Sequence, residues 1–185
     1  MSRENVEVIR TSMTPTAHER RRLEERLALR FPRIYDSISR LIWRLPKSRL
    51  RRALIRRLVR TSWEAFNRGD LEAAFLPYHP DCQSTFPSQM ATIGLEPGTY
   101  DRDERVRFQQ RVIDEWDEIR FEPSELIEIG DRLLSIGQMR FRGLSSGVPV
   151  VTEWVAMITT RNGRVIREQI FTDHAEALEA AGLSE

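Results

Sequence analysis

The chain has 185 residues, of which 40% are hydrophobic and 31% charged. This is the size of one ordinary domain with a globular composition, and no apolar run approaches the roughly 18 residues that a membrane-spanning helix needs. The single Cys82 excludes an internal disulfide, and residues 2–10 lack the apolar run of a signal peptide. We therefore expect a cytoplasmic protein.

The net charge of +1 conceals an uneven distribution along the chain. Residues 11–60 contain 14 Arg and one Lys against four acids, a net charge of +11, whereas residues 61–185 contain 12 Arg against 22 acids, a net charge of −10. Two interpretations follow from this split. Either the basic segment lies on the acidic remainder of the chain, or it binds an anionic partner.

The N-terminal part of the chain predicts three helices. Residues 16–31 open with capping-box spacing and carry leucine or phenylalanine at every fourth position from residue 23 onward. Residues 34–45 carry a second apolar stripe, which lies between two prolines. A third helix should begin near Ser48 and run unbroken to about Arg68, because Gly69 supplies a C-terminal stop.

The rest of the chain predicts helices followed by a run of strands. We expect a short helix over residues 71–78, a strand over 82–86, a loop over 87–100 and a helix over 101–116. Four strand-like runs come next, at residues 121–129, 133–142, 148–160 and 165–172. The first of them should be an edge or bulged strand because it contains Pro123. Asn162-Gly163 is a hairpin signal, and a terminal helix follows Asp173. This order indicates an α+β fold.

Two segments carry a resemblance to a known family. Residues 63–74 read WEAFNRGDLEAA and residues 176–183 read EALEAAGL, with one more helix and the four strand-like runs between them. This arrangement resembles the SnoaL-like branch of the nuclear transport factor 2-like superfamily. The resemblance implies a cone-shaped domain, in which a curved antiparallel sheet wraps around helices and encloses one deep pocket. It also implies a homodimer, since relatives often pair through the outer face of the sheet.

The resemblance divides the chain into two parts. The cone domain is expected over residues 61–185, and residues 1–60 form an Arg-rich helical extension or insertion. The sequence Arg-Thr-Ser at positions 10–12 recurs at positions 60–62. Residues 2–10 could therefore form the N-terminal half of the helix that leads into residue 63, with residues 11–60 as an insertion between the two halves. This is an alternative to the unbroken third helix that begins near Ser48.

The catalytic residues of ketosteroid isomerases and of SnoaL-type polyketide cyclases find no counterpart in this sequence. The positions at which ketosteroid isomerases and polyketide cyclases place their catalytic acids and tyrosine fall on Ser62, Phe86, Trp154 or Val155, and Ile170. None of these side chains can act as an acid or base. Steroid isomerisation by that mechanism is therefore not expected.

A few polar residues remain as catalytic candidates. Glu153 and Glu168, together with Arg140 or Arg142, would resemble the acid–arginine–acid set of limonene-epoxide hydrolases. The same residues could instead form ion pairs on the outer face of the sheet. His79, at the rim of the cone, is either a general base or ordinary polar surface.

Asp173 and the histidines complete the list of polar candidates. Asp173 could reach a ligand, but it also has the position of a helix N-cap. His18, His79 and His174 do not have the spacing of metal ligands, and the sequence has no phosphate-binding glycine loop. We expect no bound metal and no cofactor.

Apolar residues are the better evidence for a ligand pocket. Large apolar side chains fall on the elements that line such cones, where they could serve as pocket wall or simply as core. The candidate pocket residues are Trp63, Phe66, Tyr78, Phe86, Trp116, Met139, Phe141, Trp154 and Phe171.

The basic extension admits three interpretations. Residues 40–60 combine arginines with an apolar stripe and Trp43, as an interfacial helix on an anionic membrane surface would. Nucleic acid is a less favoured partner, because the chain has no nucleic-acid-binding motif. The helices could also pack on the domain or on a second subunit and leave their arginines in solvent.

Two functions from different classes follow from this sequence. The chain could bind a small organic ligand, and could transform it as a cofactor-independent isomerase, cyclase or hydrolase, on the analogy of its fold. The alternative is a non-catalytic dimeric interaction protein whose basic arm contacts a partner or a membrane.

Overall fold

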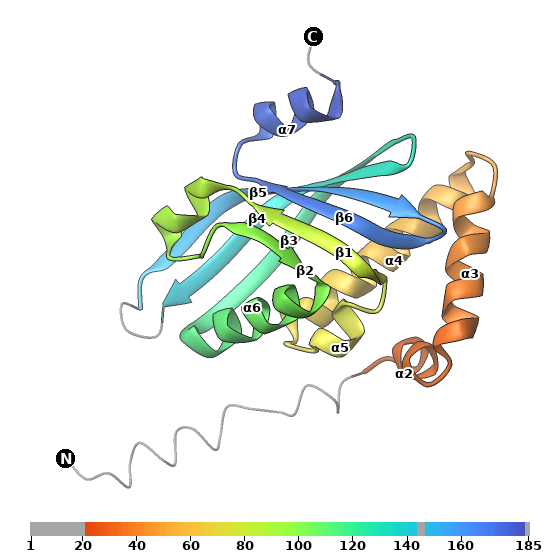
Figure 1. Ribbon diagram of the computed structural model, residues 1–185, viewed down its shortest axis with the longest axis horizontal. Helices are drawn as coiled ribbons and strands as arrows, with labels where there is room; N and C mark the ends of the chain where they lie inside the picture. Colours follow the sequence, from red (N-terminus) through yellow and green to blue (C-terminus); the bar gives the residue numbers. More distant parts are fainter. Residues whose placement is uncertain (1–20, 144–146, 184–185) are drawn as a thin grey trace, which may run out of the picture.

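A single curved sheet of six strands organises the molecule (Figure 1). The structure is a computed structural model that describes residues 21–143 and 147–183. The strands follow the order β2-β1-β6-β5-β4-β3, and every neighbouring pair is antiparallel except β1 and β6, which are parallel. Their bounds are β1 Tyr78–Phe86, β2 Gly98–Asp101, β3 Trp116–Ile129, β4 Arg132–Gly143, β5 Pro149–Arg161 and β6 Arg164–Phe171.

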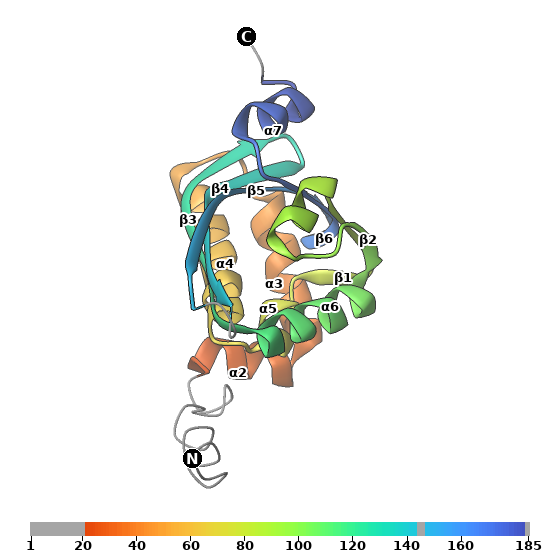
Figure 2. The same ribbon diagram turned by 90° about the vertical axis from the view of Figure 1, so that its left-hand side faces the viewer.

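Helices cover both faces of this sheet, most of them on its concave side (Figure 2). Among the helices of the described residues, α4 and α6 lie within the curve of the sheet, and α7 lies on the convex side. The helices are α2 Leu23–Arg30, α3 Pro32–Arg44, α4 Arg49–Asn67, α5 Leu71–Ala74, α6 Arg102–Glu115 and α7 His174–Ala181, with a 3-10 turn, η2, at Ser88–Ile93. The α+β cone predicted from the sequence is confirmed.

Local sequence signals fix the ends of these helices. The Ser48 side chain accepts a hydrogen bond from the Arg51 amide and starts α4, and Gly69, at φ +74°, follows its end. Asp101 and Glu104 form the capping box that opens α6. Asp173 caps α7 by accepting a hydrogen bond from the backbone amide of the third helical residue. The starts of these three helices could therefore be predicted from the sequence.

The two faces of the sheet carry separate apolar clusters, because side chains alternate along each strand. The concave cluster joins Trp154, Ile158 and Ile170 to α4 and α6. The convex cluster contains Val155 and Phe171, and α7 covers it. The interior of the cone is thus bounded by one set of alternate strand residues.

The extension and the cone share a helix. Helix α4 begins among the arginines and ends in the concave core, so it crosses the proposed boundary at residues 60 and 61 without a break. Part of the basic segment lies on acidic groups of the remainder, as one of the two interpretations of the charge split required. Arg51 pairs with Glu128 of β3, and Arg21 pairs with Asp70 at 2.7 Å.

Helix α3 is attached to the turn between β5 and β6. The Ser39 hydroxyl donates a 2.6 Å hydrogen bond to the Gly163 carbonyl. A Cβ at Gly163 would lie 2.6 Å from the Arg40 amide nitrogen, and this glycine has φ +80°. The Asn162-Gly163 hairpin signal therefore serves a second purpose, since only glycine allows α3 to approach so closely.

The structure differs from the sequence expectations in a few elements. The short helix ends at Ala74, and the first strand already begins at Tyr78 instead of residue 82. The segment expected to be a loop contains η2 and the edge strand β2, which its glycine and proline content concealed. Pro123 lies in edge strand β3 at a register shift, as predicted. The capping box at residues 16–19 and the repeat at residues 10–12 lie outside the described residues.

Candidate functional site

A buried carboxylate stands at the centre of the concave face. Glu168 of β6 is 1% exposed, and both of its oxygens accept hydrogen bonds. The Tyr78 hydroxyl donates to Oε1 at 2.8 Å, and the Ser84 hydroxyl donates to Oε2 at 2.9 Å. Burial and the nearby Glu168 carboxylate raise the pKa of Tyr78 well above its ordinary value. Tyr78 is therefore a neutral hydrogen-bond donor near pH 7.

Helix α6 supplies the positive charge for this carboxylate. Arg105 is 2% exposed, and its Nε lies 3.6 Å from Glu168 Oε2. Its Nη1 donates a 2.8 Å hydrogen bond to Gln109 Oε1, while its Nε has no hydrogen-bond partner. The guanidinium lies 4.7 Å from the centre of the Phe86 ring. Three further rings, those of Phe66, Phe75 and Phe108, lie within 5.6 Å of it.

Sequence reasoning did not identify Arg105. The signal was present, because Arg105 shares the helical spacing of Phe108, Gln109 and Val112, and all four are buried. An arginine on the inward stripe of an amphipathic helix has to find a partner inside the protein. Only the fold shows that this partner is Glu168, 63 positions later in the chain.

Two small cavities flank this polar cluster inside the cone. One, of about 60 Å³, lies between α3, α4 and the sheet, where Trp63, Phe66 and Tyr78 line it. The other, of about 10 Å³, lies between α6 and the sheet. Ligand pockets usually enclose roughly 300–1,000 Å³. Both cavities are far smaller than this, so side chains of the described residues fill most of the space in which the resemblance implies a deep pocket.

The smaller cavity contains a second unsatisfied donor. Trp154 lines it and is 4% exposed, yet its Nε1 has no hydrogen-bond partner. Trp116, which is only half-buried, packs edge-on against Phe141 with ring centres 4.7 Å apart and forms part of the same lining. The full lining also includes Phe86, Leu95, Phe108, Gln109, Val112, Ile119, Phe121 and Met139.

The structure brings most of the candidate pocket residues to the inside of the cone. Trp63, Phe66 and Tyr78 face the larger cavity, and five others face the smaller one: Phe86, Trp116, Met139, Phe141 and Trp154. Phe171 is the exception. It lies in the convex cluster beneath α7, so it cannot line the interior of the cone.

The proposed acid–arginine–acid set is not assembled. Glu168 points into the cone, whereas Glu153 is exposed on the convex face, because its β5 neighbour Trp154 points inward. Arg140 pairs with Glu122, and Arg142 pairs with Glu118, in each case as an exposed cross-strand ion pair. The outer-face interpretation therefore holds for both arginines, while Glu168 belongs to the interior.

The two remaining polar candidates lie outside this interior. His79 sits at the surface, where its Nδ1 accepts a 3.1 Å hydrogen bond from the Asp81 amide. Asp173 caps α7 on the convex side. Within residues 21–143 and 147–183, no group of three or more His, Cys, Asp or Glu side chains could hold a metal ion. Among the same residues, no helix is long and apolar enough to cross a membrane.

The curved sheet, the helices packed in its concavity and the polar cluster at its centre define a protein of the nuclear transport factor 2-like cone fold. The family model of the SnoaL-like domain matches residues 59–168. The chain therefore belongs to the SnoaL-like domain family. No curated protein matches the chain.

Solved structures agree with this assignment. An NTF2-like protein of unknown function from Burkholderia pseudomallei is 32% identical at a TM-score of 0.57, over 67% of this chain and 94% of that one. TerC, co-crystallised with polyporic acid, is 25% identical at a TM-score of 0.56, over 68% and 96%. An NTF2-like protein from Burkholderia thailandensis is 24% identical at a TM-score of 0.55, over 69% and 94%.

Proposed function

We propose that this protein binds a small, largely apolar organic molecule between α6 and the concave face of the sheet. The observation that carries the proposal is a buried donor without an acceptor, Trp154 Nε1, in the aromatic lining of the smaller cavity. Arg105 packs on the Phe86 ring of the same lining, and its Nε faces Glu168 at 3.6 Å without forming a hydrogen bond. Buried polar groups are almost always hydrogen-bonded, so a buried donor without a partner requires an explanation. A ligand with a carbonyl, carboxylate or phenolate oxygen would accept a hydrogen bond from Trp154 Nε1.

The size of the cavity sets a condition on this proposal. A space of about 10 Å³ holds at most one water, so the ligand has to displace side chains. Trp116 and Phe141 are the natural candidates, because Trp116 is half-buried and packs edge-on against Phe141. Ligand entry thus requires the aromatic pair to swing outward, with the ring surface of the ligand taking its place.

Chemistry on the bound molecule would rest on the Glu168 cluster. Both oxygens of Glu168 already accept hydrogen bonds, so the carboxylate acts first as the anchor that holds Tyr78 and Arg105 in place. Cationic Arg105, whose guanidinium packs on Phe86 in the lining of that cavity, would stabilise a developing oxyanion, which suits an isomerase, cyclase or hydrolase that needs no cofactor. This reaction class rests on the analogy of the fold.

The test begins with native mass spectrometry of freshly purified protein, followed by release and identification of any retained molecule. Polyporic acid then serves as a defined probe, because it is the compound crystallised with TerC. Binding should quench tryptophan fluorescence and raise the melting temperature.

Matched variants locate the binding site. Arg105→Met/Glu168→Gln removes the charged pair without leaving one charge alone, and Arg107→Met alters an exposed arginine on the same helix. The proposal requires the double variant to lose affinity for the retained ligand or probe while the control keeps it. Equal binding by all three proteins would refute it, as would a folded protein that retains nothing and binds nothing after exposure to an extract of its source cell.

The second candidate is a non-catalytic interaction protein with a closed cone. The observation in its favour is the cavity size, about 60 and 10 Å³, which leaves no preformed room for a ligand. Under this proposal the chain forms a homodimer and works through its surface. Light scattering that finds only monomer at high concentration would exclude the dimer, and a retained ligand would exclude the closed cone.

A further inference from the structure

The two N-terminal helices expose an unusual amount of apolar surface. Six large apolar side chains of α2, α3 and their junction, here called the apolar ridge, are each between 44% and 73% exposed; they are Leu23, Leu27, Phe31, Ile34, Ile38 and Leu41. Single exposed apolar residues are ordinary, but a contiguous row of this length marks a contact surface. Helices α2 and α3, which carry the ridge, lie at one end of the molecule (Figure 1).

The ridge continues into an apolar groove. Phe31, Ile34 and Ile38 also line a depression of about 500 Å³ whose opposite wall is formed by Leu54 and Leu58 of α4. This groove is far larger than either cavity inside the cone. Ridge and groove together form one apolar surface on the outer side of the extension.

The helices that carry this apolar surface also carry many exposed arginines. Eight exposed arginines of α2, α3 and α4 have no ion pair among the described residues; they are Arg26, Arg30, Arg33, Arg40, Arg44, Arg49, Arg52 and Arg56. The described acids of the extension are already engaged, because Glu24, Glu25 and Asp36 each pair with an arginine. The surface of the extension therefore carries a large uncompensated positive charge.

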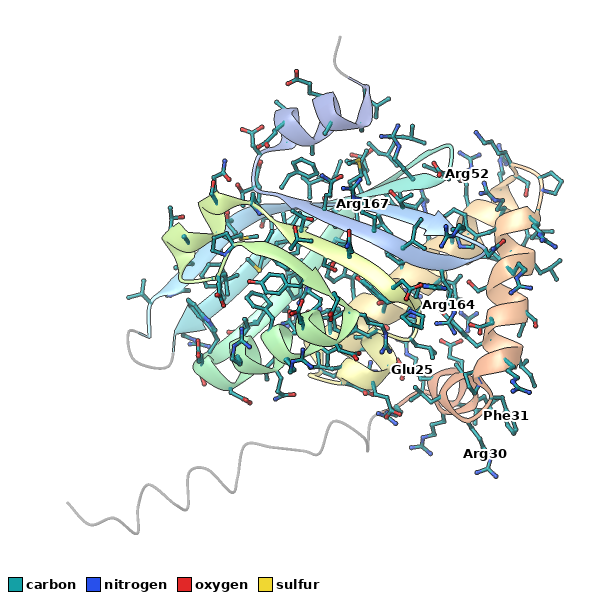
Figure 3. The ribbon with its side chains drawn as sticks, viewed as in Figure 1. Glu25, Arg30, Phe31, Arg52, Arg164 and Arg167 are labelled. Atoms are coloured by element: carbon teal, nitrogen blue, oxygen red, sulfur yellow. The ribbon has the colours of Figure 1, made fainter. Side chains whose placement is uncertain are left out.

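Helical geometry places these charges beside the apolar residues. Arg33, Arg40 and Arg44 follow the i, i+7, i+11 spacing of one stripe of α3, directly next to the stripe of Ile34 and Ile38. On the other side, Arg57 of α4 lines the apolar groove and also a second groove walled by arginines. Figure 3 shows Arg30 and Phe31 projecting from the corner of α2 and α3, whereas Arg52 lies at the opposite end of the extension.

We propose that this surface docks on a lipid bilayer that contains anionic headgroups. The apolar ridge would enter the boundary between headgroups and acyl chains, while the flanking arginines contact the headgroups. The remaining part of the chain carries a net charge of −10 and would face away from the membrane. The proposal is independent of what the cone binds.

The charges argue against two other occupants. A second copy of the chain, meeting this surface through a two-fold axis, would bring arginine against arginine. A nucleic acid would use the arginines but leave the apolar ridge exposed to water. Trp43, considered earlier as an interfacial anchor, does not contribute, because it is half-buried beneath Arg51 and lines the larger cavity.

The experiment is co-sedimentation of the full chain with vesicles. Vesicles of phosphatidylcholine alone are compared with vesicles that contain one third phosphatidylserine, at low and at high salt. The proposal predicts binding to the anionic vesicles only, with affinity that falls as salt rises. Absence of binding at low salt, or equal binding to both vesicles, overturns it.

Variants on exposed residues test each half of the surface. Ile34→Ser/Ile38→Ser should lower affinity at least tenfold, whereas Val150→Ser/Val151→Ser, at an exposed apolar pair of β5, should not. Arg40→Gln/Arg44→Gln, beside the ridge on α3, should lower affinity roughly 25-fold, about fivefold for each arginine lost.

The control for charge is Arg107→Gln/Arg111→Gln, which removes two arginines at the same spacing on α6 and should leave affinity unchanged. Circular dichroism checks that each variant is folded. Equal losses in variants and controls would overturn the proposal. So would a dimer that the Ile34→Ser/Ile38→Ser variant abolishes while vesicle binding is absent.

Discussion

Replacing Arg105 by methionine should destabilise the fold far more than the loss of one surface charge. Both members of the pair are almost fully buried, at 2% and 1% exposure, so the variant would leave the Glu168 carboxylate without its counter-ion. Removing one partner of a buried ion pair typically costs about 3–5 kcal/mol. For a chain of this length, that corresponds to a fall in melting temperature of roughly 6–20 °C.

The double variant Arg105→Met/Glu168→Gln distinguishes a pair from two separate residues. It removes both charges, so it should recover part of the loss, and the coupling energy should exceed about 1 kcal/mol. The exposed control Arg107→Met should change stability by no more than about 0.5 kcal/mol. Urea unfolding followed by tryptophan fluorescence measures wild type, Arg105→Met, Glu168→Gln, the double variant and Arg107→Met. Additive effects, or a cost for Arg105→Met no larger than for the control, would refute the reasoning.

Three further predictions concern single residues elsewhere in the fold. Burial and the Glu168 carboxylate raise the pKa of the Cys82 thiol to about 12, so a thiol reagent at pH 8 should label it only after unfolding; rapid labelling of native protein would contradict this. Burial acts to raise the pKa of Asp70, but hydrogen bonds, chiefly from Arg21, hold it below 3.8. Asp70→Asn should therefore lower the free energy of unfolding by about 2 kcal/mol at pH 7, and this difference from wild type should vanish as pH falls through the folded-state pKa of Asp70. A difference that stays constant with pH in urea titrations would exclude this account. Gly163→Ala should lower the free energy of unfolding by about 1–3 kcal/mol, because it forces α3 away from the hairpin. An unchanged melting temperature would show that the contact is loose.

The fold could be predicted because its signals are local. Capping residues, the hairpin dipeptide and the apolar spacing of α4 each act over a few positions, and each marks an element boundary that the structure confirms. Strand β2 was not predicted, because its four residues, next to a proline and a glycine, carry too little periodicity to be distinguished from a loop.

The interior of the cone could not be predicted in the same way. Which face of a strand points inward depends on register, and one position reverses the answer, as Glu153 and Trp154 illustrate. The polar cluster joins residues of β1, α6 and β6, which no sequence spacing relates. The small size of the two cavities between the described residues depends on how the aromatic rings pack, and composition carries no information on that.

Helix α4 also decides where the chain can be shortened. The family match begins at residue 59, which lies in the middle of this helix. A protein cut there would carry Trp63 and Phe66 on a stub of nine residues, shorter than the roughly 12 that a helix needs to persist on its own. A truncation before Ser48 would keep the helix and its cap intact. The arginine-bearing segment is thus continuous with a helix of the core. It cannot be removed at the family boundary without destabilising the cone.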